Sequence, residues 1–96
     1  MPIFNDEEME GIVVMSIALA VPEERREAIY LAEPLLRDGF LQVLFDHANL
    51  GGFSGDFTSI RNMEVLRRKL REKAQGFPVG KDVAQVLITE IGRQDF

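Results

Sequence analysis

The run of ten residues from Ile12 to Val21 constrains the fold more than any other segment of the chain. Its odd positions are all large and apolar, whereas its even positions shrink to Ser16, Ala18 and Ala20. Side chains of a β-strand alternate between two faces, so a period of two predicts a strand with one face toward a core and one face of small residues. We expect this segment to be the main strand of the fold.

A central helix is predicted from Pro34 to about Asn49, because two glycines follow as a strong stop signal. Its apolar residues fill roughly 200° of the helical wheel at 100° per residue. They are Leu36, Phe40, Leu41, Val43, Leu44, Phe45 and Ala48. So broad an arc predicts a helix that is packed on two sides.

Another helix is predicted from a cap at Thr58 or Ser59 to about Gln75, where Gly76 ends it. Its apolar residues make a narrow stripe, which is typical of a half-exposed helix. The stripe consists of Ile60, Met63, Leu66, Leu70 and Ala74. Residues 23–33 read as a short helix or as an extended arm, and the acids that open the segment favour the helix.

Two further strands are predicted at the ends of the chain. Residues 2–4 form a short edge strand, with turn formers after it at Asn5 and Asp6. Residues 83–91 carry apolar side chains on both faces, as a paired inner strand does. The order of elements predicts one α+β domain over residues 1–96, with a small, mostly antiparallel sheet covered on one face by two to three helices.

Composition excludes several kinds of chemistry. The chain has no cysteine, so disulfides, thiolate catalysis and cysteine-based zinc sites are excluded, and a net charge of −5 argues against nucleic acid as a partner. The one histidine, His47, lies near the carboxyl end of the central helix, where a structural role is expected. An enzyme would have to use it with Asp46, Asp56 or a water. We expect no enzyme and no catalytic, cofactor or metal residues.

Two features leave alternatives open. The glycine-rich segment 50–57 is expected to be a plain turn between helices, but a small ligand could bind in a pocket beneath Phe53 and Phe57. Arg37 lies inside the apolar arc of the central helix. Because an unpaired buried charge is costly, Arg37 is a candidate for a structural ion pair or for a stem that reaches solvent. A contact with a neighbouring subunit is the alternative.

Charge is distributed unevenly along the chain. Residues 60–75 hold six bases and two acids, a charge of +4, while the rest holds five bases and fourteen acids, a charge of −9. Such a run is usually a solvated helix face. The functional alternative is a head-to-tail contact between this basic helix and the acidic surface of the next copy. The candidate interaction residues are Arg61, Val65, Arg68, Lys69 and Arg71.

The stretch Leu41-Gln42-Val43-Leu44-Phe45-Asp46-His47-Ala48-Asn49 resembles alphaproteobacterial members of the FliL family of flagellar basal-body-associated proteins. Other segments resemble the family in their order and spacing. Pro34-Leu35-Leu36-Arg37-Asp38-Gly39-Phe40-Leu41 is similar to the family's Pro-x-x-Arg-Asp opening of the main helix, and Val43-Leu44-Phe45 continues it. The stretch Val79-Gly80-Lys81-Asp82-Val83, running on to Leu87-Ile88-Thr89-Glu90-Ile91, is similar to the family's closing strand. The resemblance covers residues 11–94.

The resemblance implies a periplasmic domain similar to stomatin-type (SPFH) domains, behind one N-terminal membrane helix. No run in this sequence is long enough for that helix, so an excised periplasmic domain of an inner-membrane protein is expected. The resemblance further implies a non-enzymatic protein at the flagellar basal body that self-associates in rings, contacts stator proteins and supports motility. The alternative is a small ligand-binding or protein-interaction domain unrelated to flagella.

Overall fold

A computed structural model describes residues 1–5 and 8–95. Three antiparallel strands form one sheet in the order β1-β2-β3, and they are β1 (Pro2–Asn5), β2 (Glu8–Ala20) and β3 (Gln85–Asp95). Between β2 and β3 come α1 (Arg26–Leu31), α2 (Glu33–Asn49) and α3 (Ile60–Gln75). The α+β prediction is therefore confirmed, and the early and late strands pair as expected.

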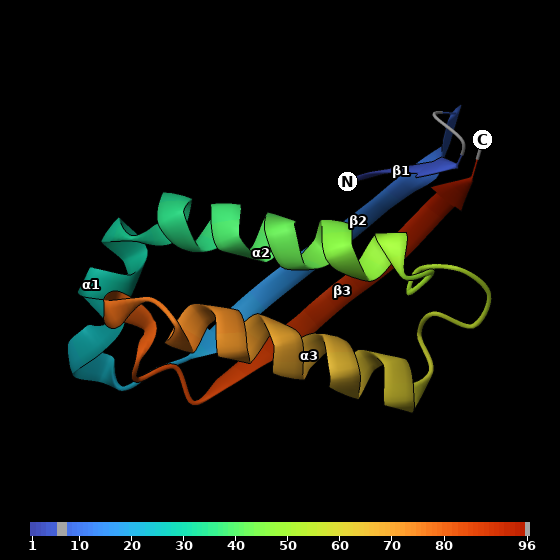
Figure 1. Ribbon diagram of the computed structural model, residues 1–96. Coiled ribbons are helices and arrows are strands. Elements are labelled where there is room, and N and C mark those ends of the chain that lie inside the picture. The colour runs from blue at the N-terminus through green and yellow to red at the C-terminus, as the bar shows by residue number, and fades with distance from the viewer. Residues whose placement is uncertain (6–7, 96) are drawn as a thin grey trace.

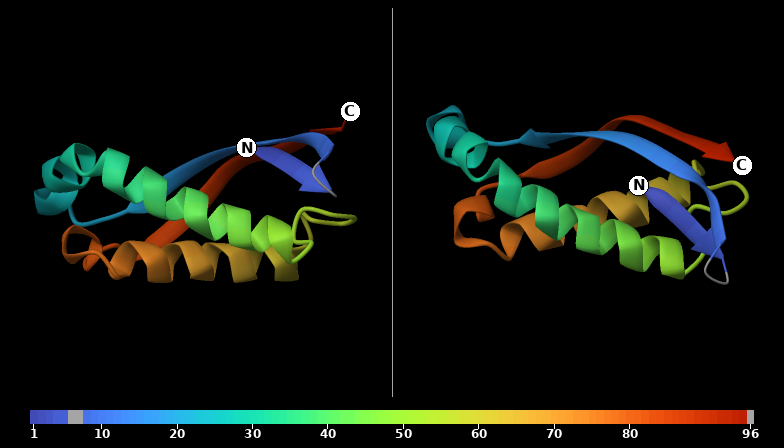
Figure 2. Two further views of the ribbon diagram at one scale, coloured as in Figure 1. Left: turned by 45° about the horizontal axis from the view of Figure 1, so that its top comes forward. Right: turned by 90° about the horizontal axis from the view of Figure 1, so that it is seen from above.

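The two long helices lie side by side on one face of the sheet, and no described element covers the other face (Figure 1, Figure 2). The core lies between these layers. Its least exposed side chains are Phe53, Leu66, Leu70 and Val83. On β2, Val13 is buried and Met15, Ile17 and Leu19 are half-buried, whereas Val14 on the opposite face is exposed. The period of two in this strand thus separates a helix-facing side from a bare side.

Residues 23–33 are helical and not an extended arm. A 3₁₀ turn, Glu23–Arg25, leads into α1, and Ala32 separates α1 from α2. Pro34 occupies the first turn of α2, where its missing N–H leaves no hydrogen bond unmade. The predicted break at the proline is confirmed.

The carboxyl end of α2 is closed by its two glycines. Gly51 has a φ of 78°, in the left-handed region that glycine adopts without strain. The N–H of Gly51 donates to the carbonyl of Ala48, and the N–H of Gly52 donates to that of His47. These two bonds form a Schellman motif, which satisfies carbonyls that the helix itself leaves free.

The central helix is packed on one side only, so the prediction of two packed sides is wrong. Leu36, Phe40 and Leu44 are buried against the core, but Leu41 is 38% exposed and Phe45 47% exposed. The broad arc reflects an open apolar groove beside α2, described below. On α3, the predicted stripe is buried from Met63 to Ala74, whereas Ile60 is 79% exposed because it is the first residue of the helix.

The prediction that residues 83–91 form an inner strand is also wrong. In the order β1-β2-β3, β2 is the inner strand and β3 is an edge. The register steps from Ser16 opposite Glu90 to Ile17 opposite Ile88, so Thr89 is an extra residue, a β-bulge. The bulge changes the phase of the alternation, and Leu87 is apolar although it faces solvent. The bulge and the exposed Leu87 together place apolar residues at both odd and even positions of β3, although only one face of the strand is buried.

The short first strand lies at an edge of the sheet, as predicted, and it pairs with the beginning of β2. Pro2 lies opposite Ile12, and Ile3, opposite Gly11, is buried in the core. The turn predicted at Asn5 and Asp6 extends outside the described residues.

Candidate functional site

His47 is buried, 3% exposed, in the last turn of α2. Its ring meets the ring of Phe53 edge to face, with centroids 5.1 Å apart. Among the described residues, neither ring nitrogen has a partner with hydrogen-bond geometry. The pKa of His47 is lowered from its usual 6.5, chiefly by burial and also by the charge of Lys69. The side chain of Asn62 and the backbone of Gly52, which lie nearby, raise this pKa by less than the first two causes lower it. The imidazole is therefore a neutral core group at pH 7.

The carboxylates considered as partners of His47 point elsewhere. Asp46 and Asp56 are both exposed, whereas the imidazole faces the interior. No three His, Asp or Glu side chains among the described residues are grouped as metal ligands. Within the described part of the chain, His47 is thus a buried side chain and the two carboxylates are surface groups.

The glycine-rich loop after α2 is fixed by its aromatic residues. Phe53 is 1% exposed, and Phe57 packs against it with ring centroids 6.3 Å apart. The amide of Asn62 donates to the carbonyls of Gly52 and Phe57. The two aromatic rings and the amide of Asn62 thus hold this loop against the end of the helix.

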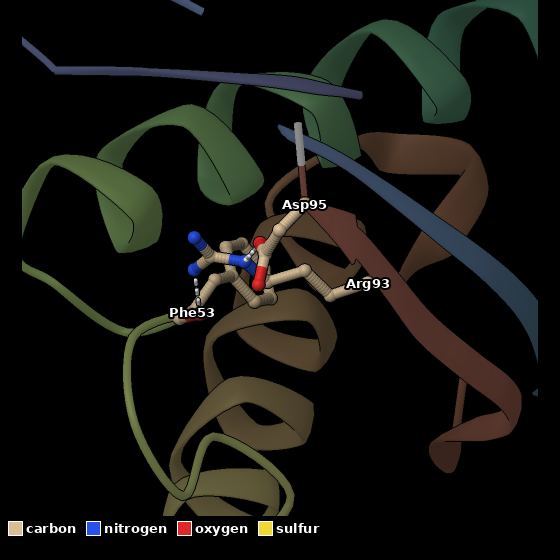
Figure 3. Close-up of polar contacts among 3 residues, drawn as sticks. All are labelled: Phe53, Arg93 and Asp95. Atoms are coloured by element: carbon tan, nitrogen blue, oxygen red, sulfur yellow. Dashed lines mark hydrogen bonds and ion pairs between the residues drawn. The ribbon is translucent and has the colours of Figure 1, made fainter. Parts of the chain in front are cut away.

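A second polar contact ties this loop to the sheet. The guanidinium of Arg93 on β3 donates to the carbonyl of Phe53 and pairs with the carboxylate of Asp95 (Figure 3). The sequence alone did not indicate Asn62 or Arg93, because both contacts depend on how the loop folds back over the core. Their role is to hold the loop.

Arg37 forms the predicted ion pair. Its guanidinium lies 2.7 Å from the carboxylate of Glu33, one turn earlier on α2. The Arg37 side chain is 73% exposed, so the charge is not buried. An exposed pair at this spacing contributes about 0.3–0.5 kcal/mol.

Four of the five predicted interaction residues line one groove between α3 and the start of β3. These four are Arg61, Val65, Arg68 and Arg71. The groove measures about 660 Å³, and Gln85, Val86 and Leu87 form its β3 side. Arg67, which the sequence analysis did not single out, lines it as well. We call this hollow the basic groove.

Charges in the basic groove are unbalanced. It contains four arginines and only one acid, Glu64, which gives a charge of +3. Among the described residues, none of the four guanidinium groups pairs with a carboxylate. Lys69, the fifth predicted residue, lies apart from them, half-buried and close enough to His47 to affect its pKa. The structure therefore assembles four of these residues and separates the fifth.

An apolar groove of about 640 Å³ runs along the opposite edge of the sheet, between β2 and the helices α1 and α2. Its floor is formed by Met15, Ile17 and Leu19 of β2. The helices contribute further apolar side chains, which are Ile29, Tyr30, Leu36, Phe40, Leu41 and Leu44. We call this hollow the apolar groove. The broad apolar arc of α2 was its signal in the sequence.

The helices beside the apolar groove are acidic overall, while the charged residues that line the groove itself are Arg26, Glu33 and Arg37. Residues 23–46, which include α1 and most of α2, carry six acids and three arginines, a charge of −3. All six carboxylate residues are exposed. The two edges of the molecule therefore differ in sign, because the basic groove follows β3 and α3 while the acidic surface follows α1 and α2.

Comparisons with protein-family models, with curated proteins and with solved structures gave no match for this chain. No helix among the described residues has the length and the apolar character that crossing a membrane requires. The functional argument consequently rests on the two grooves, their charges and the sequence motifs.

Proposed function

We propose that this domain is a non-enzymatic assembly module whose copies bind one another head to tail. One observation carries the proposal. The basic groove has a charge of +3, and its arginines pair with no carboxylate in the described part of the chain, whereas residues 23–46, which include α1 and most of α2, carry −3. Opposite charges on two different surfaces of one chain favour a heterologous contact, which closes into a ring or continues as a filament.

The flagellar setting of this module is also a proposal, and it is supported by the order and spacing of the motifs that resemble the FliL family. In this setting the domain lies in the periplasm at the flagellar basal body, beside stator proteins. It reaches the inner membrane only through an N-terminal helix outside this sequence. Rings of the domain around the stator support motility, and no reaction is catalysed.

Charge reversal in the basic groove tests the contact. Arg68 is exposed and lies in the groove, so Arg68→Glu should leave the free energy of unfolding within about 0.5 kcal/mol of the wild-type value. It should weaken self-association about tenfold, because a cation facing the acidic surface becomes an anion. Sedimentation velocity over a range of protein concentrations measures the association constant.

Lys81→Glu is the matched control, because Lys81 is exposed and lies outside the groove while the change in net charge is the same. A general effect of net charge would weaken association equally in both variants and would contradict the proposal. Raising the salt from about 50 mM to about 500 mM should weaken wild-type association, since surface charges are screened over a few ångströms at the higher value.

The apolar groove supports a second candidate function, the binding of a small apolar ligand by a domain unrelated to flagella. Its volume and lining are of the kind that small molecules occupy. The same experiments separate the two functions. A monomeric ligand-binding domain would show a sedimentation coefficient that is independent of protein concentration and salt. The sedimentation coefficient of an assembly module would rise with protein concentration and fall with added salt.

A further inference from the structure

The inner strand β2 has an open edge over most of its length. β1 covers only its beginning, since Pro2 lies opposite Ile12 and Met1 exchanges backbone hydrogen bonds with Val13. From Val14 to Ala20, no described strand lies on that side. An uncovered edge presents unpaired N–H and C=O groups, on which another strand can add.

The hydrogen bonds show which residues present these groups. Backbone groups of successive residues in an antiparallel strand point to opposite sides. Val13 points toward β1, and the carbonyl of Ala20 accepts from the N–H of Ala84 on the β3 side. The bulge at Thr89 lies in β3, so the alternation along β2 is unbroken from Val13 to Ala20. Odd residues from Met15 to Leu19 therefore point their N–H and C=O groups toward the open side.

The same three odd residues form the floor of the apolar groove. A strand added at this edge would thus gain backbone hydrogen bonds and apolar contacts together. Nearby, Leu41 and Phe45 of α2 keep exposed apolar surface. Strand addition beside such a surface is a common way of binding an extended segment.

The far edge of β3 is open in the same way. Val86 lies opposite Leu19, and Ile88 opposite Ile17. Residues directly opposite each other in an antiparallel pair point their backbone groups either both toward each other or both away from each other, and Leu19 and Ile17 point theirs away from β3. Val86 and Ile88 consequently point theirs away from β2, at an edge that no described strand covers. This open edge begins in the basic groove.

We propose that the open edge of β3 in one copy pairs antiparallel with the open edge of β2 in the next, so that one sheet continues from copy to copy. The occupant of the β2 edge is thus a second copy of this chain. Net charge favours it, since the β3 edge carries the basic groove at +3 and residues 23–46, which form the helices beside the β2 edge, carry −3 in total. The inference rests on the proposed head-to-tail association and specifies its contact.

The pairing fits the directions and lengths of the strands. When two copies have the same orientation, β3 of one runs antiparallel to β2 of the other, as it does within one chain. The open stretch from Val14 to Ala20 is seven residues, or about 23 Å, and β3 is longer. The helices of both copies then lie on the same side of the continuous sheet.

Single cysteines test the pairing, because the chain has none of its own. Ala18 on β2 and Leu87 on β3 both lie on the bare face of the sheet, and each becomes cysteine in a separate variant. In the proposed pairing both positions fall at non-hydrogen-bonded sites, where opposite Cα atoms are about 4.5 Å apart. That distance suits a disulfide. Ser16→Cys replaces Ala18→Cys if the register is shifted by two residues.

The two variants are mixed at equal concentration and oxidised mildly. Disulfide between Ala18→Cys and Leu87→Cys should form roughly tenfold more than either variant forms with Glu72→Cys, because pairing holds the two thiols at a high effective concentration. Glu72 is an exposed residue of α3 that serves as the collision control. The products are separated by non-reducing electrophoresis and identified by mass.

Three outcomes would overturn the pairing. Disulfides formed mainly between two Ala18→Cys chains would mean that β2 edges pair with each other about a two-fold axis. Mixed disulfide at the level of the control, in samples that still associate in sedimentation, would reject edge pairing and leave the proposed function standing. Samples that do not associate at any concentration would reject the proposed function itself.

Discussion

His47 shows how much one side chain can make stability depend on pH. Its imidazole is buried without a hydrogen-bonded partner among the described residues, and burial together with Lys69 lowers its pKa from 6.5. In the unfolded chain the imidazole has a pKa of about 6.5. Below that pH the unfolded state therefore binds a proton that the folded state does not. Stability should therefore be constant above this pH and fall as the pH decreases below it.

The expected loss is at most about 1.4 kcal/mol per pH unit, from the free energy of one proton. Urea unfolding at about pH 7.5, 6.5 and 5.5 measures it. His47→Gln removes the titrating group and should flatten this part of the profile, whatever its effect on stability at pH 7.5. Equal slopes in both proteins would assign the pH dependence to the carboxylates instead.

Single residues were predictable when their role followed from their place on one helix. The burial of His47 agrees with its place in the apolar arc of α2, whereas Glu33, the partner of Arg37, lies before the predicted start of that helix and was not named. Lys69 was grouped wrongly with Arg68, because a helical wheel gives directions around an axis but not the neighbour that each direction meets. The contacts of Arg93 bring together residues forty positions apart, which no local pattern encodes.

The start of α3 illustrates what a cap contributes to an element. The sequence left Thr58 and Ser59 as alternatives, and the structure selects Ser59, whose hydroxyl accepts from the N–H of Asn62 at 3.3 Å. Ser59→Ala should lower the free energy of unfolding by about 1 kcal/mol, because that N–H has no helical partner.

Thr58→Ala is the control, since Thr58 is exposed and makes no cap bond. Its effect should stay within about 0.5 kcal/mol. Chemical denaturation of the two variants side by side measures both values. A larger loss in Thr58→Ala than in Ser59→Ala would contradict the cap.

Elements with strong end signals were predicted best. The bounds of α2 and α3 follow from a proline, a serine cap and glycines, all of which act through local backbone chemistry. The position of β3 in the sheet was predicted wrongly, because a bulge at Thr89 imitates the pattern of a strand buried on both faces. Periodicity assumes a constant phase, and a bulge breaks that assumption.

Across the whole molecule, the α+β class and the layer of helices on one face followed from the order of elements. The two grooves did not, because each depends on how a strand and a helix are placed relative to each other, which the pattern within either element does not give. The unequal charge of the two edges was visible as a basic helix in an acidic chain. Only the fold places the positive and the negative charge at opposite edges of the sheet. This placement is the reason for proposing a repeating assembly of identical copies.

The bulge at Thr89 also decides where this chain tolerates a change in length. Val86 and Ile88 face the helices before it, and Ile91 and Arg93 face them after it. Deleting Thr89 restores strict alternation and keeps all four on the same face, so the variant should unfold at a urea concentration close to that of the wild type. Deleting Leu87 turns Val86 to solvent and should unfold the domain. Homologous sequences one residue shorter are thus expected to carry their alignment gap at this position.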